Sequence, residues 1–483
     1  MFIVPDKDAK NRPAGVRASI VARKRGNARG AKGRRKMDSR KTTMSEDQPS
    51  KVPHAAKQDG EVLFRWSWTQ RAVWTERMLT ALEQGVKGGC WFSLMDKVYA
   101  PRNLEAAYQQ VARNRGAAGV DHVTVKRFGD RLLDELPKLS QQLRDGTYRP
   151  QAVRRVHIPK PGTRETRPLG IPTVRDRVAQ AAVVNVIEPI FEREFAEHSY
   201  GFRPGRGCKD ALRRVDRLLK DGYVYVVDAD LKSYFDTIPH DRLMTRVKER
   251  IADSRVLSLV EAFLTAGILD GLTTWTPEAG APQGAVLSPL LSNIYLNPLD
   301  HHVAQAGMQM VRYADDFVIL CRTPEEAQQA LELVRQWTAE NGLVLHPSKT
   351  KIVDARKDGF DFLGYRFVKH RRFPRRKSLD KFKDAIRAQT KRTSGDSMHF
   401  IVTRLNSTLR GWFAYFQHSD RYPFPILDRW IRVRLRSILR KRSGRKGRGR
   451  GLDHHRWPNA YFTNLGLFSL VTARELAARS SPR

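Results

Sequence analysis

The stretch VRYADDFVIL, residues 311–320, decides how this sequence folds. Apolar residues fill most of it, which predicts a buried strand, and Asp315 and Asp316 interrupt the apolar run. Successive side chains of a strand point to opposite faces, so two adjacent aspartates cannot simply pair with one partner. Two interpretations are open for such acids: each caps a turn or forms an ion pair, or together with other acids they bind cations.

The sequence just after this stretch carries helix signals. Thr323, Pro324 and Glu326 are a suitable N-cap, first-turn proline and capping-box glutamate, and they predict a helix that runs to about Glu340. Gly342 suits a left-handed stop, and GLVLH (342–346) is expected to open another strand.

A second acidic strand lies upstream, in YVYVVDADLKSYFD (223–236), where Asp230 ends another apolar run. If Asp230 lies beside Asp315, their clustered negative charge requires cations. Ligand sets made only of oxygen select Mg²⁺, with Mn²⁺ as a substitute. Two such ions can activate a primer 3′-hydroxyl and stabilise the leaving pyrophosphate.

Around these strands, the pattern from about residue 148 to 367 alternates short β-rich runs with helical stretches, which indicates an α+β or α/β domain. Beyond about residue 373 the pattern becomes helical and basic. A chain of 483 residues is too long for one ordinary core, so several domains are expected.

The charge balance predicts a polyanionic partner. Lys plus Arg number 88 against 51 for Asp plus Glu, a formal charge of +37, which favours nucleic acid over a merely soluble basic protein. Cys90, Cys208 and Cys321 lack metal-binding spacing, which argues against a zinc site or a disulfide framework. No apolar run approaches the roughly 20 residues that span a bilayer, and we expect a cytoplasmic protein with no membrane contact.

The motifs together resemble the bacterial group II intron-encoded reverse transcriptase and maturase family, from about residue 90 to 470. Eight blocks stand in the family's order: NRGAAGVD (114–121), IPKPGTRETRPLGIPTVRDRVAQ (158–180), SYGFRPGRGC (199–208), DADLKSYFD (228–236), APQGAVLSPLLSNIYL (281–296), YADD (313–316), GLVLHPSKT (342–350) and FLGY (362–365). Any one block is weak, but eight in order exclude coincidence.

The resemblance implies an α+β multi-domain right-hand polymerase with fingers, palm and thumb, and a helical C-terminal maturase region. We predict a disordered basic arm over residues 1–60, an N-terminal extension with fingers over 61–222 and a palm over 223–372. A thumb and maturase RNA-binding region is expected over 373–450, and a C-terminal segment that docks on the fold over 451–483.

It also implies site residues. Asp230 and Asp315 are expected to hold both metal ions, with Asp316 assisting and the backbone carbonyl of Leu231 completing a site. Phe235 stands at the family's steric-gate position, where its ring leaves no room for a ribose 2′-hydroxyl. Without the resemblance, Phe235 is interpreted as an ordinary core aromatic residue.

Further residues match positions that contact the incoming deoxynucleoside triphosphate. Gln283 is one, and Lys160 and Arg167 match finger residues that grip the triphosphate. The intervening turn is about one residue longer than the common family form, so the register leaves Arg164 as an alternative to Arg167. Lys349 matches a residue that can protonate pyrophosphate, the alternative being a solvated lysine.

The C-terminal region resembles the family's thumb and RNA-binding region. Arg429, Arg432, Arg436 and Arg440 share one face of a predicted helix, where they either contact an RNA backbone or form a solvated face. His454 and His455 have no nearby cysteine, so the family's metal-binding endonuclease module is expected to be absent.

The predicted function is magnesium-dependent RNA-directed DNA synthesis on an RNA template with a DNA primer. The resemblance adds binding of a group II intron RNA, help in its splicing, and retrohoming into a target DNA. Two alternatives are a domesticated relative acting in DNA repair or phage defence and a splicing-only RNA-binding maturase. The sequence leaves the oligomeric state open.

Overall fold

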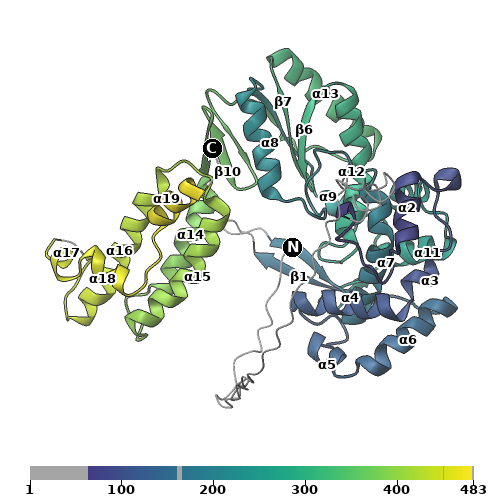
Figure 1. Cartoon of the computed structure of the whole chain (residues 1–483), viewed down its shortest axis with the longest axis horizontal. Helices are drawn as coiled ribbons and strands as arrows, with labels where there is room; N and C mark the ends of the chain where they lie inside the picture. The colour runs from purple at the N-terminus through teal and green to yellow at the C-terminus, as the bar shows by residue number, and fades with distance from the viewer. Residues whose placement is uncertain (1–63, 160–165, 450, 481–483) are drawn as a thin grey trace, which may run out of the picture.

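The computed structural model describes residues 64–159, 166–449 and 451–480 (Figure 1). The predictions for the basic arm 1–60, for Lys160 and for Arg164 lie outside the described residues. Within the described part of the chain, no helix combines the length and apolarity needed to cross a membrane.

A four-stranded antiparallel sheet, ordered β6-β7-β3-β8, carries the two acidic motifs. Its strands run as β3 Tyr225–Asp230, β6 Gln309–Tyr313, β7 Asp316–Cys321 and β8 Lys351–Asp354. The apolar residues of β3 are buried because both faces of the sheet are covered. Val227, Ala229, Phe317 and Ile319 pack into the large core with the helices on one side, while Val226, Val318 and Leu320 pack into a second core that includes α8 (Cys208–Lys220).

The stretch 311–320 was predicted to be one strand, and this prediction is wrong. The stretch forms the two strands of a hairpin. β6 ends at Tyr313 and β7 begins at Asp316, and these two residues pair across the turn. Ala314 takes the left-handed conformation, with φ +60°. Asp315 therefore lies in a two-residue turn, and the strict alternation of strand faces does not apply to it.

The helix after the hairpin forms as its local signals predicted. α13 spans Pro324–Glu340, the Thr323 side chain accepts from the amide of Glu326, and Gly342 has φ +68°. The stretch 342–346 is not a strand. It makes a single bridge, Leu231 to Leu345, and β8 begins at Lys351.

A second sheet, ordered β2-β1-β4-β5, contains β1 Val153–Pro159 and β2 Thr166–Ile171, which lie in the range predicted as N-terminal extension and fingers. The hairpin of β4 Ile268–Asp270 and β5 Thr273–Trp275 falls inside the range predicted as palm, yet β4 pairs in parallel with β1. The hairpin therefore belongs to the β1–β2 sheet and not to the sheet with the aspartates.

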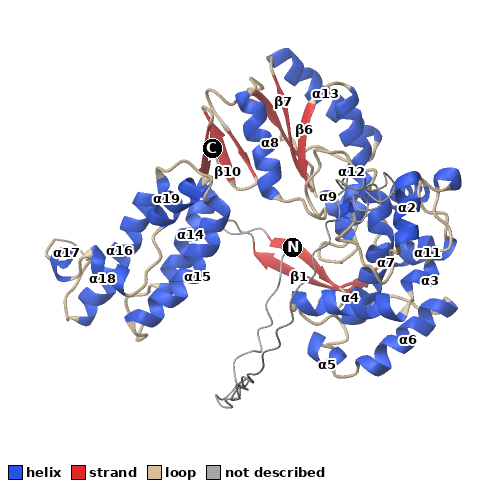
Figure 2. Ribbon diagram, viewed as in Figure 1, coloured by secondary structure: helices blue, strands red, loops and turns tan. Residues whose placement is uncertain are grey.

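Helices pack against the sheet with the aspartates and lie beside the β1–β2 sheet, and most of them share the large core (Figures 1 and 2). Most residues of α7 are buried, which explains why it is apolar on nearly every side. The helices of this part are α2 Glu76–Gln84, α3 Met95–Val98, α4 Pro101–Asn114, α5 Val125–Gly129, α6 Leu132–Asp145, α7 Val174–Glu192, α9 Tyr234–Thr237, α10 His240–Lys248, α11 Ser254–Leu264 and α12 Ser288–Gln305, with a 3₁₀ turn at Lys87–Gly89.

A small antiparallel sheet of β9 Phe360–Phe362, β10 Tyr365–Val368 and β11 Arg371–Pro374 leads into a helical region with its own core (Figure 2). Trp457, Phe462 and Leu470 join this core, so the last segment packs on the preceding helices. The helices are α14 Arg376–Gln389, α15 Met398–Phe416, α16 Pro423–Arg442, α17 Asp453–Arg456, α18 Asn459–Asn464 and α19 Leu470–Ser480.

Candidate active site

Three predicted aspartates gather at one end of the β3–β7 sheet. Asp230 is the last residue of β3 and pairs directly with Asp316, the first residue of β7. Asp315 precedes Asp316 in the hairpin turn. The antiparallel register therefore brings together acids that are 85 and 86 residues apart in the sequence.

The electrostatics of these acids indicate crowded negative charge. Surrounding protein atoms, together with the charges of Asp315, Asp228 and Asp230, raise the pKa of Asp316 to about 7, although its side chain reaches solvent. Burial, and then the charge of Asp230, raise the pKa of Asp315, whereas Arg167 and Arg312 act in the opposite direction. The cluster thus holds protons at a pH where isolated aspartates are ionised.

Asp228 belongs to the same cluster, although the sequence analysis did not select it. It stands two residues before Asp230, so both side chains project from the same face of the sheet. Burial raises the pKa of Asp228 to about 6, with Lys351 lowering it and the charges of Asp361 and Asp230 raising it further. Its signal in the sequence was the period-two spacing of the D-A-D motif.

A lysine forms an ion pair with one acid of the cluster. The ammonium of Lys349 lies 2.7 Å from an Asp230 carboxylate oxygen. Backbone bonds hold this segment against the end of β3: the amide of His346 donates to the carbonyl of Asp230, and the amide of Lys232 donates to the carbonyl of Val344. Neither bond uses the carbonyl oxygen of Leu231, the predicted backbone ligand.

The donor chemistry of the cluster fits a hard divalent cation, because Asp230, Asp315 and Asp316 offer only carboxylate oxygens and repel one another. Among the described residues, no three Asp, Glu, His or Cys side chains are already arranged to hold an ion. The Lys349 ammonium meets part of the demand for positive charge at Asp230. These three aspartates could supply the ligands of such a cation.

Arg167 lies on β2, opposite Ile158 of β1, and its charge lowers the pKa of Asp315. The structure thus brings the predicted triphosphate-binding arginine within electrostatic reach of the acids. Lys160, its predicted companion, lies outside the described residues.

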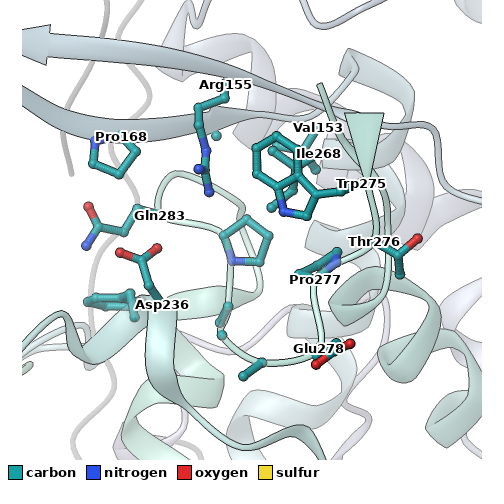
Figure 3. A pocket seen from close by; sticks show the side chains of 16 residues that line it. Val153, Arg155, Pro168, Asp236, Ile268, Trp275, Thr276, Pro277, Glu278 and Gln283 are labelled. Atoms are coloured by element: carbon teal, nitrogen blue, oxygen red, sulfur yellow. The ribbon is translucent and has the colours of Figure 1, made fainter. Parts of the chain in front are cut away.

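Phe235 and Gln283 line one pocket of about 510 Å³ (Figure 3). The amide of Ala281 donates to the carbonyl of Phe235, and the amide of Gly170 donates to the carbonyl of Gln283. Gly284 has φ +107°, and a side chain there would meet the carbonyl of Gly170 at 2.5 Å. The glycine therefore permits the close approach of this loop to β2.

Polar groups that the sequence analysis did not select also line this pocket (Figure 3). The Arg155 guanidinium lies 4.8 Å from the ring centre of Trp275. Burial raises the pKa of Asp236, and the charge of Arg155 lowers it. The pocket therefore offers both an aromatic face and opposite charges.

A buried arginine adjoins the acidic turn. Arg312 of β6 is fully buried, and its Nε and Nη2 atoms donate to the two carboxylate oxygens of Asp300 at 2.7 and 2.5 Å. Its Nη1 atom donates to Asn293 at 3.0 Å and to the carbonyl of Ala314 at 2.9 Å. The signal that the sequence analysis passed over was a charged residue inside an apolar strand.

The predicted arginine stripe on α16 is wrong for Arg436, and Arg440 is engaged within the chain. Arg436 is 2% exposed and donates to the carbonyl of Trp457 and the side chain of Asn459. Arg440 forms an ion pair with buried Asp453 and donates to the carbonyl of Lys446. Both arginines hold the segment that follows α16. Arg429 is exposed, and Arg432 and Arg440 are half-buried, so these three stay partly accessible.

Two family models match the chain. Residues 158–367 match reverse transcriptase (RNA-dependent DNA polymerase), and residues 379–457 match the group II intron maturase-specific domain. The first range includes all the aspartates of the cluster, and the second includes most of the helical region.

Curated relatives point the same way. Protein YkfC of Escherichia coli (strain K12) is 35% identical over 350 residues, which cover 64% of this chain and 87% of YkfC. Group II intron-encoded protein LtrA of Lactococcus lactis subsp. cremoris is 38% identical over 231 residues, which cover 47% of this chain and 37% of LtrA.

Similar solved structures include a partial Cas6-RT-Cas1–Cas2 complex and the telomerase of Candida albicans. The first is 27% identical with a TM-score of 0.34, covering 51% of this chain and 41% of the other. The second is 12% identical with a TM-score of 0.38, covering 66% of this chain and 64% of the other.

Proposed function

Because this chain belongs to the bacterial group II intron reverse transcriptase and maturase family, we propose that it copies RNA into DNA with Mg²⁺ and assists the splicing of an intron RNA. The chain is an RNA-directed DNA polymerase by family, and reverse transcriptases use divalent metal ions. The choice of Mg²⁺, the deoxynucleotide substrate, the intron RNA and retrohoming into a target DNA are parts of the proposal.

The observation that carries the polymerase function is the cluster of Asp230, Asp315 and Asp316, formed across the β3–β7 register. Divalent ions bound there would activate a primer 3′-hydroxyl and stabilise the leaving pyrophosphate. Arg167 supplies a fork of donors suited to phosphate oxygens, and its charge lowers the pKa of Asp315 in this cluster. Phe235 and Gln283 stand on the wall of one pocket, where Phe235 would pack against the sugar of the nucleotide and Gln283 would contact the nucleotide.

Lys349 contributes a proton donor beside Asp230. Its ammonium pairs with Asp230 at 2.7 Å, and its segment is bonded to the end of β3. A divalent ion at Asp230 would compete with this pair, leaving the ammonium to contact the pyrophosphate. This is the role that the motif P-S-K-T, residues 347–350, predicted.

The maturase part of the proposal rests on the match over residues 379–457 and on the exposed basic side chains of the helical region, such as Arg376 and Arg429. Binding is the whole contribution required, because a protein that stabilises folded intron RNA need not supply metal chemistry. Phosphate contacts give such binding its salt dependence.

The decisive experiment measures both activities in one preparation. Primer extension on an RNA template is followed with Mg²⁺ and deoxynucleotides, and splicing of the cognate intron is followed at low Mg²⁺. The proposal requires Asp315→Asn to lose primer extension and keep splicing. Extension by this variant at the wild-type rate contradicts the assignment of the cluster, and loss of splicing contradicts the separation of the two functions.

A further inference from the structure

The inference concerns how the turn that carries Asp315 is held in place. Ala314 has φ +60°, a conformation that alanine rarely adopts, so neighbouring groups must stabilise it. Gly201 packs against the turn so closely that a side chain there would overlap the backbone of Tyr313 and Ala314. The turn therefore has a tight steric limit on one side.

Arg312 supplies the polar restraint. It is fully buried, and one of its Nη1 hydrogen bonds ends on the carbonyl oxygen of Ala314, one residue before Asp315. The amide of Arg312 donates to the carbonyl of His198, and its carbonyl accepts from the amide of Tyr200. The main chain of Arg312 is thus tied to residues 198–200 while its side chain reaches the turn.

The partners of the guanidinium come from a single helix. Asn293 and Asp300 are seven residues apart on α12, which places them on the same face two turns apart. Asn293 also donates to the carbonyl of Gly201, at 2.8 Å. One helix therefore supports both sides of the turn, because its Asp300 binds Arg312 and its Asn293 binds the carbonyl of Gly201.

The same helix is connected to the nucleotide residues. α12 begins at Ser288, five residues after Gln283, and the hydroxyl of Ser288 donates to the carbonyl of Pro282. Tyr234, which precedes Phe235, donates its hydroxyl hydrogen to the carbonyl of Ser292. The turn with Asp315 and the pocket wall with Phe235 and Gln283 thus rest on one rigid element.

We propose that Arg312 is a positioning residue of the polymerase site: held by Asp300 and Asn293, it fixes the turn that presents Asp315. The proposal rests on the proposed function for what Asp315 does. A buried ion pair by itself is weak evidence, since hydrophobic replacements of such pairs often leave stability unchanged. What distinguishes this pair is the additional bond to Ala314.

The guanidinium is required because its donors diverge within one plane. It reaches the Asp300 carboxylate, Asn293 and Ala314 together, whereas the ammonium of a lysine is a single point and cannot span them. Arg312→Lys is therefore expected to keep a positive charge beside Asp300 and to lose the restraint on the turn.

Two designs test the proposal, Arg312→Lys and the double variant Arg312→Met with Asp300→Leu, in the full chain. The double variant removes both charges together, so that neither is left buried and unpaired. Thermal melting and primer–template affinity establish that each protein is folded. Single-turnover extension at saturating nucleotide gives the rate, and Mn²⁺ binding followed by electron paramagnetic resonance gives metal affinity without catalysis.

The matched control is Arg203→Lys. Arg203 is also a buried arginine with a carboxylate partner, Glu192, and it donates to the carbonyls of Ala196 and Ser199. No described hydrogen bond joins its side chain to residues 313–316. It therefore reports the cost of disturbing a buried ion pair beside residues 198–201 while the direct bond from Arg312 to Ala314 stays in place.

The proposal requires that both Arg312 designs bind primer–template within about twofold of wild type, lose roughly tenfold or more in rate, and bind Mn²⁺ more weakly. Arg203→Lys should lose stability but keep rate and Mn²⁺ affinity. The proposal is overturned if either folded Arg312 design keeps the wild-type rate and Mn²⁺ affinity. If the double variant does not melt cooperatively, the result for Arg312→Lys decides between the two outcomes. Failure of the proposed function would appear separately, as activity in Asp315→Asn.

Discussion

Asp230 and Asp316 are paired residues of neighbouring antiparallel strands, the last of β3 and the first of β7. Directly opposed strand residues project from the same face with their side chains close together. Like charges in such a pair destabilise the sheet unless a cation or a proton lies between them. The predictions below follow from this arrangement and from the residues around it.

Replacement of Asp230 or Asp315 by Asn should abolish metal-dependent primer extension. Each change removes a charged ligand, and the expected loss is several kcal/mol of transition-state stabilisation, at least about a hundredfold in rate. Rapid-quench extension measures the rate, and gel shift measures affinity for the primer–template. Affinity should change little. Asp134→Asn, an exposed acid of α6, should leave both unchanged.

The metal-free protein should lose stability as pH rises toward 8. The pKa of Asp316 is raised to about 7, so the folded state holds a proton that the unfolded chain releases near pH 4. The resulting stability is present below about pH 4 and is lost as pH rises through about 7.

Melting temperatures between pH 5 and 8 test this prediction. Asp316→Asn should flatten the decline, and added Mg²⁺ should raise the melting temperature most at pH 8, where the carboxylates are ionised. A decline of the same slope in Asp316→Asn would show that other groups cause it.

Phe235→Val should admit ribonucleotides. The ring lies on the pocket wall with Gln283, and removing most of it opens space for a 2′-hydroxyl, worth about tenfold in discrimination. Paired kcat/KM measurements with ribo- and deoxynucleotides give the ratio. Phe128→Val, a buried phenylalanine of α5, should reduce stability without changing that ratio. An unchanged ratio in Phe235→Val would show that Phe235 has only a packing role in the core.

Lys349→Met should strengthen metal binding while slowing extension. The ammonium pairs with Asp230 at 2.7 Å and competes with a cation there. An exposed ion pair is worth up to about 1 kcal/mol, so Mn²⁺ affinity should rise roughly two- to fivefold. Lys232→Met removes an exposed lysine two residues from Asp230 and controls for the loss of one positive charge near the cluster. Equal effects of the two variants would exclude direct competition.

The arginines of α16 should separate into two classes. Arg429→Gln with Arg432→Gln should lower the slope of log intron affinity against log salt by up to about 2, near one for each lost phosphate contact. Arg436→Gln should instead cost about 1–3 kcal/mol of stability, because the carbonyl of Trp457 loses its buried donor. Salt titrations and urea unfolding distinguish them. An unchanged slope in the double variant would make this surface a solvated face.

Much of the local structure followed from the sequence because its causes lie within a few residues. The apolar run before Asp230 predicted a buried strand, and β3 ends at that residue. Thr323, Pro324 and Gly342 marked the ends of α13 because capping bonds join neighbours along the chain. The order of the motifs identified the family, which the matching models confirm.

Other features depended on partners far apart in the sequence, and only the tertiary structure decided them. The period of 311–320 did not show the hairpin, because the left-handed turn at Ala314 depends on Gly201 and on Arg312 held by α12. Helical periodicity placed Arg436 and Arg440 on a polar face, but α17 and the segment after it accept their hydrogen bonds, and Arg436 is buried. Periodicity reports which residues share a face. What covers that face is set by packing between distant segments, because buried charges must find their partners in space.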